Sequence, residues 1–117
     1  MAGDIVYGLA RLDASGRICD RALTDVLGWR VGDRLTLAAT GAFVLIRRDH
    51  DGLLILPSRE RIAIPAALRR RCRLGAGDQV LLAAYLRLGA LAAYSLAVVD
   101  QALHPLTRHA PQQGDRP

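Results

Sequence analysis

The hydrophobic residues of this chain are gathered into short runs that turn-forming residues separate. Apolar runs of about four to eight residues between turns are typical of β-strands, whereas a helix needs a longer stretch. Thr40-Gly41 and Asp51-Gly52 are turn dipeptides of this kind. The pattern therefore predicts a mainly β fold with short helices. The predicted strands are residues 5–12, 17–20, 35–39, 42–46, 53–56, 61–64, 80–85 and 91–95.

Two predicted helices follow two of the short strands. Pro65 suits the first turn of a helix, because the backbone N–H that proline lacks has no intrahelical partner there. Gly28 ends the first helix, and Gly75 and Gly77 follow the second, since glycine adopts the positive φ that helix ends often need. The predicted helices are residues 23–27 and 66–73, with a short third helix after the last strand.

The chain repeats itself over most of its length. Gly16-Arg17-Ile18 precedes Gly32-Asp33, and Glu60-Arg61-Ile62 precedes Gly77-Asp78 in the same way. The offset is 44 positions at the arginines and 45 at the Gly-Asp pairs. A polar, proline-containing tail follows, which has too few apolar residues to pack and is expected to be disordered. The predicted divisions are a diverged repeat at 5–50, a second repeat at 51–103 and the tail at 104–117.

The most apolar stretch, residues 80–99, has the length of a membrane-spanning helix. Arg87 would then lie near the bilayer centre, where an arginine costs at least about 2.5 kcal/mol. The equivalent part of the first repeat is a pair of short strands, and Leu86-Arg87-Leu88-Gly89 has the composition of a turn. We therefore predict a hairpin followed by a short helix, and no membrane association.

The charge balance favours a polyanionic partner. The protein has 16 basic and 11 acidic residues, a formal net charge of +5, and no lysine. Arginine suits phosphates, but a GC-rich genome is the larger part of the explanation for its exclusive use. Six arginines and one acidic residue lie between Arg59 and Arg73, so this segment carries a charge equal to that of the whole chain. Such a concentration is expected of a phosphate-binding surface, although charge runs are usually solvated helix faces.

No pattern typical of catalysis is present. The chain lacks G-x-S-x-G, and without lysine it cannot form a Walker-type phosphate loop. Asp49-His50-Asp51 contains metal-ligand residue types, but it lies in a turn beside Gly52, and we interpret it as a solvated loop. Cys19 and Cys72 are too few for a disulfide framework and are expected to be buried thiols. We therefore predict a cytoplasmic protein that is not an enzyme and has no cofactor or metal.

The segment Arg61-Ile62-Ala63-Ile64-Pro65, followed by Leu68-Arg69 and Gly77-Asp78, resembles the signature of the AbrB/MazE/SpoVT family of swapped-hairpin DNA-binding domains. The first repeat keeps Gly16-Arg17-Ile18 but has Asp20-Arg21 in the position of the isoleucine and proline. The resemblance covers about residues 5–103. It implies an AbrB-like β-barrel that two ββαββ-type repeats build by exchanging hairpins, here as a pseudo-dimer within one chain.

The resemblance further implies a nucleoid-associated transcription regulator that binds double-stranded DNA through basic side chains. We expect Arg59 and Arg61 to reach base edges, with phosphate contacts made from the helix that follows. The first repeat interleaves its arginines with aspartates, so the second repeat is expected to dominate the affinity. The candidate DNA-binding residues are Arg17, Arg21, Arg59, Arg61, Arg69, Arg70, Arg71 and Arg73.

Other functions stay open on the sequence alone. One is an antitoxin that binds a toxin protein and regulates its own promoter, although the polar tail lacks the apolar anchors of a toxin clamp. Another is a protein-interaction barrel that has lost DNA binding. Tandem members of the family, such as MraZ-type proteins, assemble further, so a homodimer or higher oligomer is also open. Trp29 is predicted to be a core residue rather than a partner anchor.

Overall fold

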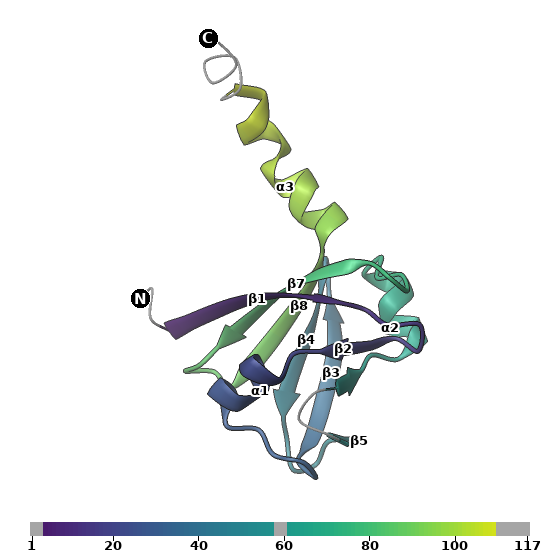
Figure 1. The fold of residues 1–117 in the computed structure, drawn as a ribbon, viewed down its shortest axis with the longest axis vertical. Coiled ribbons are helices and arrows are strands. Elements are labelled where there is room, and N and C mark those ends of the chain that lie inside the picture. Colours follow the sequence, from purple (N-terminus) through teal and green to yellow (C-terminus); the bar gives the residue numbers. More distant parts are fainter. Residues whose placement is uncertain (1–3, 58–60, 110–117) are drawn as a thin grey trace.

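The computed structural model describes residues 4–57 and 61–109, with side chains described up to residue 105. The fold is mainly β with three helices, as the sequence predicts (Figure 1). The strands are β1 (Ile5–Arg11), β2 (Arg17–Cys19), β3 (Arg34–Thr40), β4 (Phe43–Arg48), β5 (Leu54–Ile55), β6 (Arg61–Ala63), β7 (Gln79–Tyr85) and β8 (Ala90–Ser95). The helices are α1 (Arg21–Leu27), α2 (Ala66–Arg71) and α3 (Leu96–His109).

The strands form one six-stranded sheet and one two-stranded ribbon. The order in the sheet is β1-β7-β8-β4-β3-β5, and β2 pairs with β6 in the ribbon. All pairings are antiparallel. The hairpins β3–β4 and β7–β8 lie side by side at the centre of the sheet, because β4 pairs with β8.

The pairing interleaves the two halves of the chain. β1 pairs with β7, β5 with β3, β2 with β6 and β4 with β8, so each of these ladders joins the two sequence repeats. In the ribbon Ile18 lies opposite Ile62, the residue 44 positions later that occupies the same place in the second repeat. Within the described residues, neither repeat has a sheet made only of its own strands beyond a single hairpin.

A closed barrel, which was expected, is not found among residues 4–57 and 61–109. The edge strands of the sheet are β1 and β5, and no ladder joins them. Only an isolated bridge between Leu12 and Ile18 links the sheet edge to the ribbon. The physical reason lies in β5, which has two residues and therefore too few backbone groups to extend the ladder around the core.

The turn at Asp51-Gly52 does not connect two paired strands. β5 pairs with β3, so the chain passes from β4 across β3 to the opposite edge. The backbone N–H of Gly52 donates to the Asp49 carbonyl at 2.7 Å, and the backbone N–H of Asp51 donates to the Asp49 side chain at 2.9 Å. These bonds make the Asp49-His50-Asp51 triplet a turn, and the described part of the chain holds no cluster suited to a metal ion.

Local chemistry explains the two short helices. Asp20 precedes α1 and accepts a hydrogen bond from the backbone N–H of Leu23 at 3.0 Å, which is the usual N-terminal cap. Gly28, with φ of 74°, ends α1 in the left-handed region. α2 begins after Pro65 without a side-chain cap. Proline substitutes there, because its fixed φ suits the entry into a helix.

The core lies between the sheet and the ribbon, and it is aliphatic. Trp29 belongs to it with 2% of its surface exposed, which confirms the core assignment, although its indole N–H has no hydrogen-bond partner in the described part of the chain. Cys72 is buried as expected, whereas Cys19 is exposed. The expectation was wrong for Cys19 because it is the outward-facing position of β2, next to buried Ile18. Further core residues are Leu12, Leu23, Leu35, Val44, Ile46, Leu56, Ile62, Ile64, Leu74, Val80, Leu82 and Leu91.

The C-terminal helix is longer than expected. α3 begins after Ser95, whose Oγ accepts a hydrogen bond from the backbone N–H of Val98 at 3.1 Å, and continues through Pro105 to His109. The expected disordered tail from residue 104 is therefore helical over its first six positions. Proline removes one hydrogen bond but has a φ close to the helical value. Residues 110–117 lie outside the described residues. No described helix is both long and apolar enough to span a membrane.

Candidate nucleic-acid interface

The outer side of the β2–β6 ribbon presents two arginines. Ile18 and Ile62 point into the core at 2% and 4% exposure, so their neighbours along each strand point outward. The register places Arg17 opposite Ala63 and Arg61 opposite Cys19. Arg17 and Arg61 therefore lie diagonally across the ribbon, about 7–8 Å apart at their Cα atoms. The two sequence repeats contribute one arginine each to this surface.

Arg17 is held in place by the turn that precedes β2. Its Nε lies 3.0 Å from Asp13 Oδ2, while Asp13 Oδ1 accepts hydrogen bonds from the backbone N–H groups of Arg17 and Ser15. The backbone bond from Arg17 lowers the pKa of Asp13; burial opposes this shift, and the bond from Ser15 and the guanidinium charge of Arg17 add to it. Arg17 is thus oriented through its Nε, and Asp13 offsets part of its charge while the terminal nitrogens of the guanidinium are not part of this pair.

Arg69 fastens α2 to the ribbon. Its Nε donates to the backbone carbonyl of Ile64 at 2.9 Å, and the side chain is only half exposed. Its guanidinium also covers Gly16, where a Cβ would come within 2.6 Å of it. The turn before β2, the end of β6 and α2 are therefore joined around one side chain. Arg69 is expected among the phosphate contacts; its Nε has a structural partner, and a phosphate contact of this side chain stays a prediction.

The remaining arginines of α2 and the following turn are exposed. Arg70, Arg71 and Arg73 form no ion pair with any acidic side chain among residues 4–57 and 61–109, and neither does Arg61 on the ribbon. Arg71 and Arg73 line a hollow of about 250 Å³ together with Gln101 of α3. The end of α2 therefore faces the first turns of α3, and the arginine side chains there are exposed to solvent.

The first repeat pairs the arginines of β2 and α1 with aspartates, although Arg11, Arg30, Arg34 and Arg47 are exposed and form no ion pair among residues 4–57 and 61–109. Arg17 is paired with Asp13, and Arg21 lies 3.8 Å from Asp25 at Nε and Oδ2. Both pairs follow the i,i+4 spacing, which was visible in the sequence, and they lower the local positive charge around β2 and α1. Arg59 lies outside the described residues, so its expected contact with base edges stays a prediction.

Arg73 has a backbone conformation that L-residues avoid. Its φ is 60°, and it is the single positive-φ residue other than glycine in the described chain. The position equivalent to Arg73 in the first repeat, 45 residues earlier, is Gly28. At each place the next residue donates its backbone N–H into the helix, Leu74 to Arg69 at 2.8 Å and Trp29 to Thr24 at 3.0 Å. An arginine therefore occupies a helix-ending position where glycine is the unstrained choice.

Arg73→Gly is expected to stabilise the fold by about 0.5–1 kcal/mol, because it removes the left-handed strain at a small cost in chain entropy. The same change is expected to weaken DNA binding about fivefold, since one cation is lost. Thermal unfolding and DNA titration measure the two effects. Arg73→Ala is the matched control, because it removes the same charge but keeps a Cβ. Equal stability of the two variants would contradict the strain assigned to Arg73.

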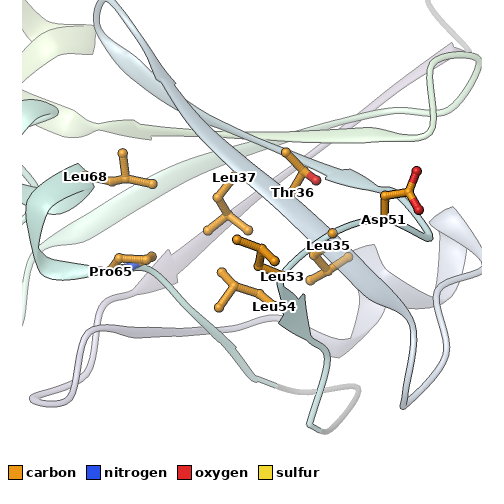
Figure 2. A pocket seen from close by; sticks show the side chains of 9 residues that line it. Leu35, Thr36, Leu37, Asp51, Leu53, Leu54, Pro65 and Leu68 are labelled. Carbon is orange, nitrogen blue, oxygen red and sulfur yellow. The ribbon is translucent and has the colours of Figure 1, made fainter.

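An apolar cavity of about 390 Å³ lies beside α2 (Figure 2). Leu68 and Pro65 form one wall, and Leu35, Leu37 and Leu54 form the other. In the first repeat Leu23 of α1 is buried against Gly8, whereas Leu68 stays half exposed, so α2 covers the sheet less closely than α1 does. Thr36 and Asp51 are the polar side chains of the lining, and the Thr36 hydroxyl donates to Asp49 Oδ2 at 3.0 Å.

Comparison with known proteins returned no matching family model, no matching curated protein and no matching solved structure. The functional interpretation therefore depends on the residues and geometry of this chain.

Proposed function

We propose that this protein is a transcription regulator that binds double-stranded DNA through an arginine-rich face, with two AbrB-like repeats forming one pseudo-dimer inside the chain. The observation that carries the proposal is the set of exposed arginines on β6, α2 and the turn after α2 that have no acidic partner among residues 4–57 and 61–109. These are Arg61, Arg70, Arg71 and Arg73. On the first repeat Arg17, Arg21 and Arg48 are paired with aspartates, whereas the segment from Arg61 to Arg73 carries five arginines and no acidic residue.

The shape of the ribbon suits this function. A two-stranded β-ribbon is narrow enough to enter the major groove of B-DNA, where base edges present a readable pattern. Arg17 and Arg61 project from the outer side of the ribbon, and arginine binds guanine with two parallel hydrogen bonds. The cations of α2 would then lie along the phosphates at the groove edge. Phosphate contacts of this kind fix the position, and the ribbon reads the sequence.

The interleaved pairing supports the pseudo-dimer. Strands from each repeat pair with strands of the other, and equivalent residues meet in the ribbon. Exchange of hairpins between two AbrB-like units would produce this pattern of ladders. The open edge between β1 and β5 means that the proposed pseudo-dimer is an unclosed variant of the barrel.

The proposal is tested by selecting sheared genomic DNA with the purified protein near physiological salt and sequencing the retained fragments. A few fragments with a shared motif are the expected result. A shared site upstream of a toxin-like neighbour would move the assignment to an antitoxin. Uniform recovery of all DNA fragments would mean that the arginine-rich face binds DNA without sequence specificity. Recovery of no fragments would favour a protein-interaction module.

A further inference from the structure

β7 and β8 are apolar on both faces. On the core side β7 places Val80, Leu82 and Ala84, and on the other side it places Leu81, Ala83 and Tyr85. Strands that are apolar on both faces are usual where both faces of a sheet are covered. β3 differs, because its outward positions include the two polar residues Thr36 and Thr40. The sheet thus has a second apolar face, confined to β1, β7, β8 and β4.

Cross-strand registers arrange this outer face in rows. One row contains Leu9, Leu81, Tyr94 and Phe43 on four neighbouring strands. The next row contains Tyr7, Ala83, Ala92 and Leu45. Four of the five aromatic residues of the protein lie on this side: Tyr7, Phe43, Tyr85 and Tyr94.

The aromatic residues contact one another, but they do not cover the outer apolar face. The rings of Phe43 and Tyr94 have centroids 4.8 Å apart, and the hydroxyls of Tyr85 and Tyr94 are 3.5 Å apart. Burial, followed by the contact with Tyr85, raises the pKa of Tyr94 to about 12, so this side chain stays uncharged well above neutral pH. Tyr7 and Leu9 are still 63% and 60% exposed. A soluble protein rarely leaves so large an apolar patch uncovered.

Helix α3 overhangs the same face. Val98, Val99 and Leu103 of α3 line a cavity of about 450 Å³ whose other wall is formed by Tyr7, Phe43, Leu81, Tyr85 and Tyr94. Beyond its first turns α3 leads away from the body of the protein (Figure 1), and Leu103 is 47% exposed. An isolated helix shorter than about 12–15 residues is marginal in water, so the outer part of α3 needs further packing.

The chemistry of the cavity favours a second copy of this chain as its occupant. No charged side chain lines it, although the chain carries a net charge of +5, so neither DNA nor an acidic protein is complementary to it. What fits is an uncharged apolar helix face. Each copy has one such helix face and one such cavity, which is the condition for a two-fold, self-complementary interface.

The available surface agrees with this partner. Tyr7, Leu9 and Leu103 together expose roughly 300 Å², taking about 150–250 Å² for a large apolar side chain. A stable interface buries about 800 Å² on each partner. The proposed interface would take the remainder from the half-buried side chains around the cavity and from the exposed turns of α3, because it uses both the helix and the sheet face of each copy.

We infer that two copies associate through this outer face, with α3 of each chain packed into the cavity between α3 and the sheet of the other. None of the arginines on β6 and α2 lines this cavity, although Ala42 and Val98 line both it and the hollow beside Arg71 and Arg73. The inference therefore stands whether or not the chain binds DNA.

Sedimentation equilibrium of the full-length protein from about 1 to about 100 µM tests the inference. A dimer is expected for the native chain. Leu9→Glu on β1 and Leu103→Glu on α3 should each weaken it at least about 100-fold, because an unpaired carboxylate would be buried in an apolar interface. Leu53→Glu is the matched control, since Leu53 is 91% exposed and lines the other apolar cavity. A monomer at every concentration, or a dimer that neither variant weakens, would overturn the inference.

A cross-link distinguishes helix exchange from any other use of the face. In a Cys19→Ser background, Tyr7→Cys protein is mixed with Leu103→Cys protein under mild oxidation. A covalent heterodimer is expected, because Leu103 of one copy would lie over β1 of the other. A mixture that yields no heterodimer, while the chains still sediment as dimers, would overturn the proposed exchange of α3.

Discussion

Replacing Arg61, Arg70 and Arg71 together by alanine is expected to weaken binding to duplex DNA about 100-fold at 0.15 M salt. Each phosphate that a cation neutralises contributes about 0.9 to the slope of log affinity against log salt concentration. Three lost contacts should therefore lower the magnitude of that slope by about 2.7. Fluorescence anisotropy at several salt concentrations gives both quantities. Arg69 is left unchanged because its bond to the Ile64 carbonyl makes it part of the fold.

The control for this variant removes the same charge from elsewhere. Arg30, Arg47 and Arg87 are exposed and lie in the loop after α1, on β4 and in the β7–β8 turn. Their replacement by alanine also lowers the net charge by three. A loss of DNA affinity that both triple variants show therefore reflects only the overall charge of the protein. If the two triple variants bind DNA equally well, the arginine face on β6 and α2 does not form the interface.

Much of the fold is predictable because the chain is built twice. The Gly-Asp turns and the short apolar runs gave every strand to within two residues, since strand length and turn chemistry are local properties. The similarity of Arg17-Ile18 and Arg61-Ile62 also indicated which residues are equivalent, and the structure pairs Ile18 with Ile62. Barrel closure was not predictable in this way. Closure depends on how many residues of β5 pair with a neighbouring strand, and the apolar run at residues 53–56 does not indicate that number.

The site was only partly predictable for a related reason. A count of arginines locates the positive segment but does not say which guanidinium groups have partners. Arg69 bonds to Ile64 and covers Gly16, contacts that depend on where α2 lies relative to the other repeat. The strain at Arg73 did have a signal in the sequence, because the repeat alignment sets it against Gly28. The outer apolar face also had one, since residues 80–99 are apolar without alternation.

α3 shows where a compositional argument fails. Residues 104–109 have the proline and polar side chains of a tail, and the structure continues the helix through them. Helix continuation is decided by the preceding turns, which start from the Ser95 cap and carry an apolar stripe. Pro105 cannot donate a hydrogen bond, but it does not require a change of φ.

Ile62→Ala on the ribbon is expected to lower the free energy of unfolding by about 2–4 kcal/mol, because truncating a buried isoleucine loses its transfer energy and leaves a cavity. Ile62 is 4% exposed and faces Ile18 across the ladder that joins the two repeats. The whole molecule should therefore still unfold in one cooperative transition, with a lower melting temperature. Calorimetry and circular dichroism during heating measure it, with Leu88→Ala, at a residue 73% exposed, as the control.

The number of thermal unfolding transitions shows whether the two repeats unfold together or separately. Ladders between β1 and β7, β3 and β5, and β4 and β8 mean that unfolding of one repeat exposes the strands of the other. A double-mutant cycle with Ile18→Ala should then show a coupling energy of about 0.5–3 kcal/mol, as for residues in direct contact. Two separate melting steps in Ile62→Ala, with only one of them shifted, would mean that the repeats fold independently despite their shared sheet.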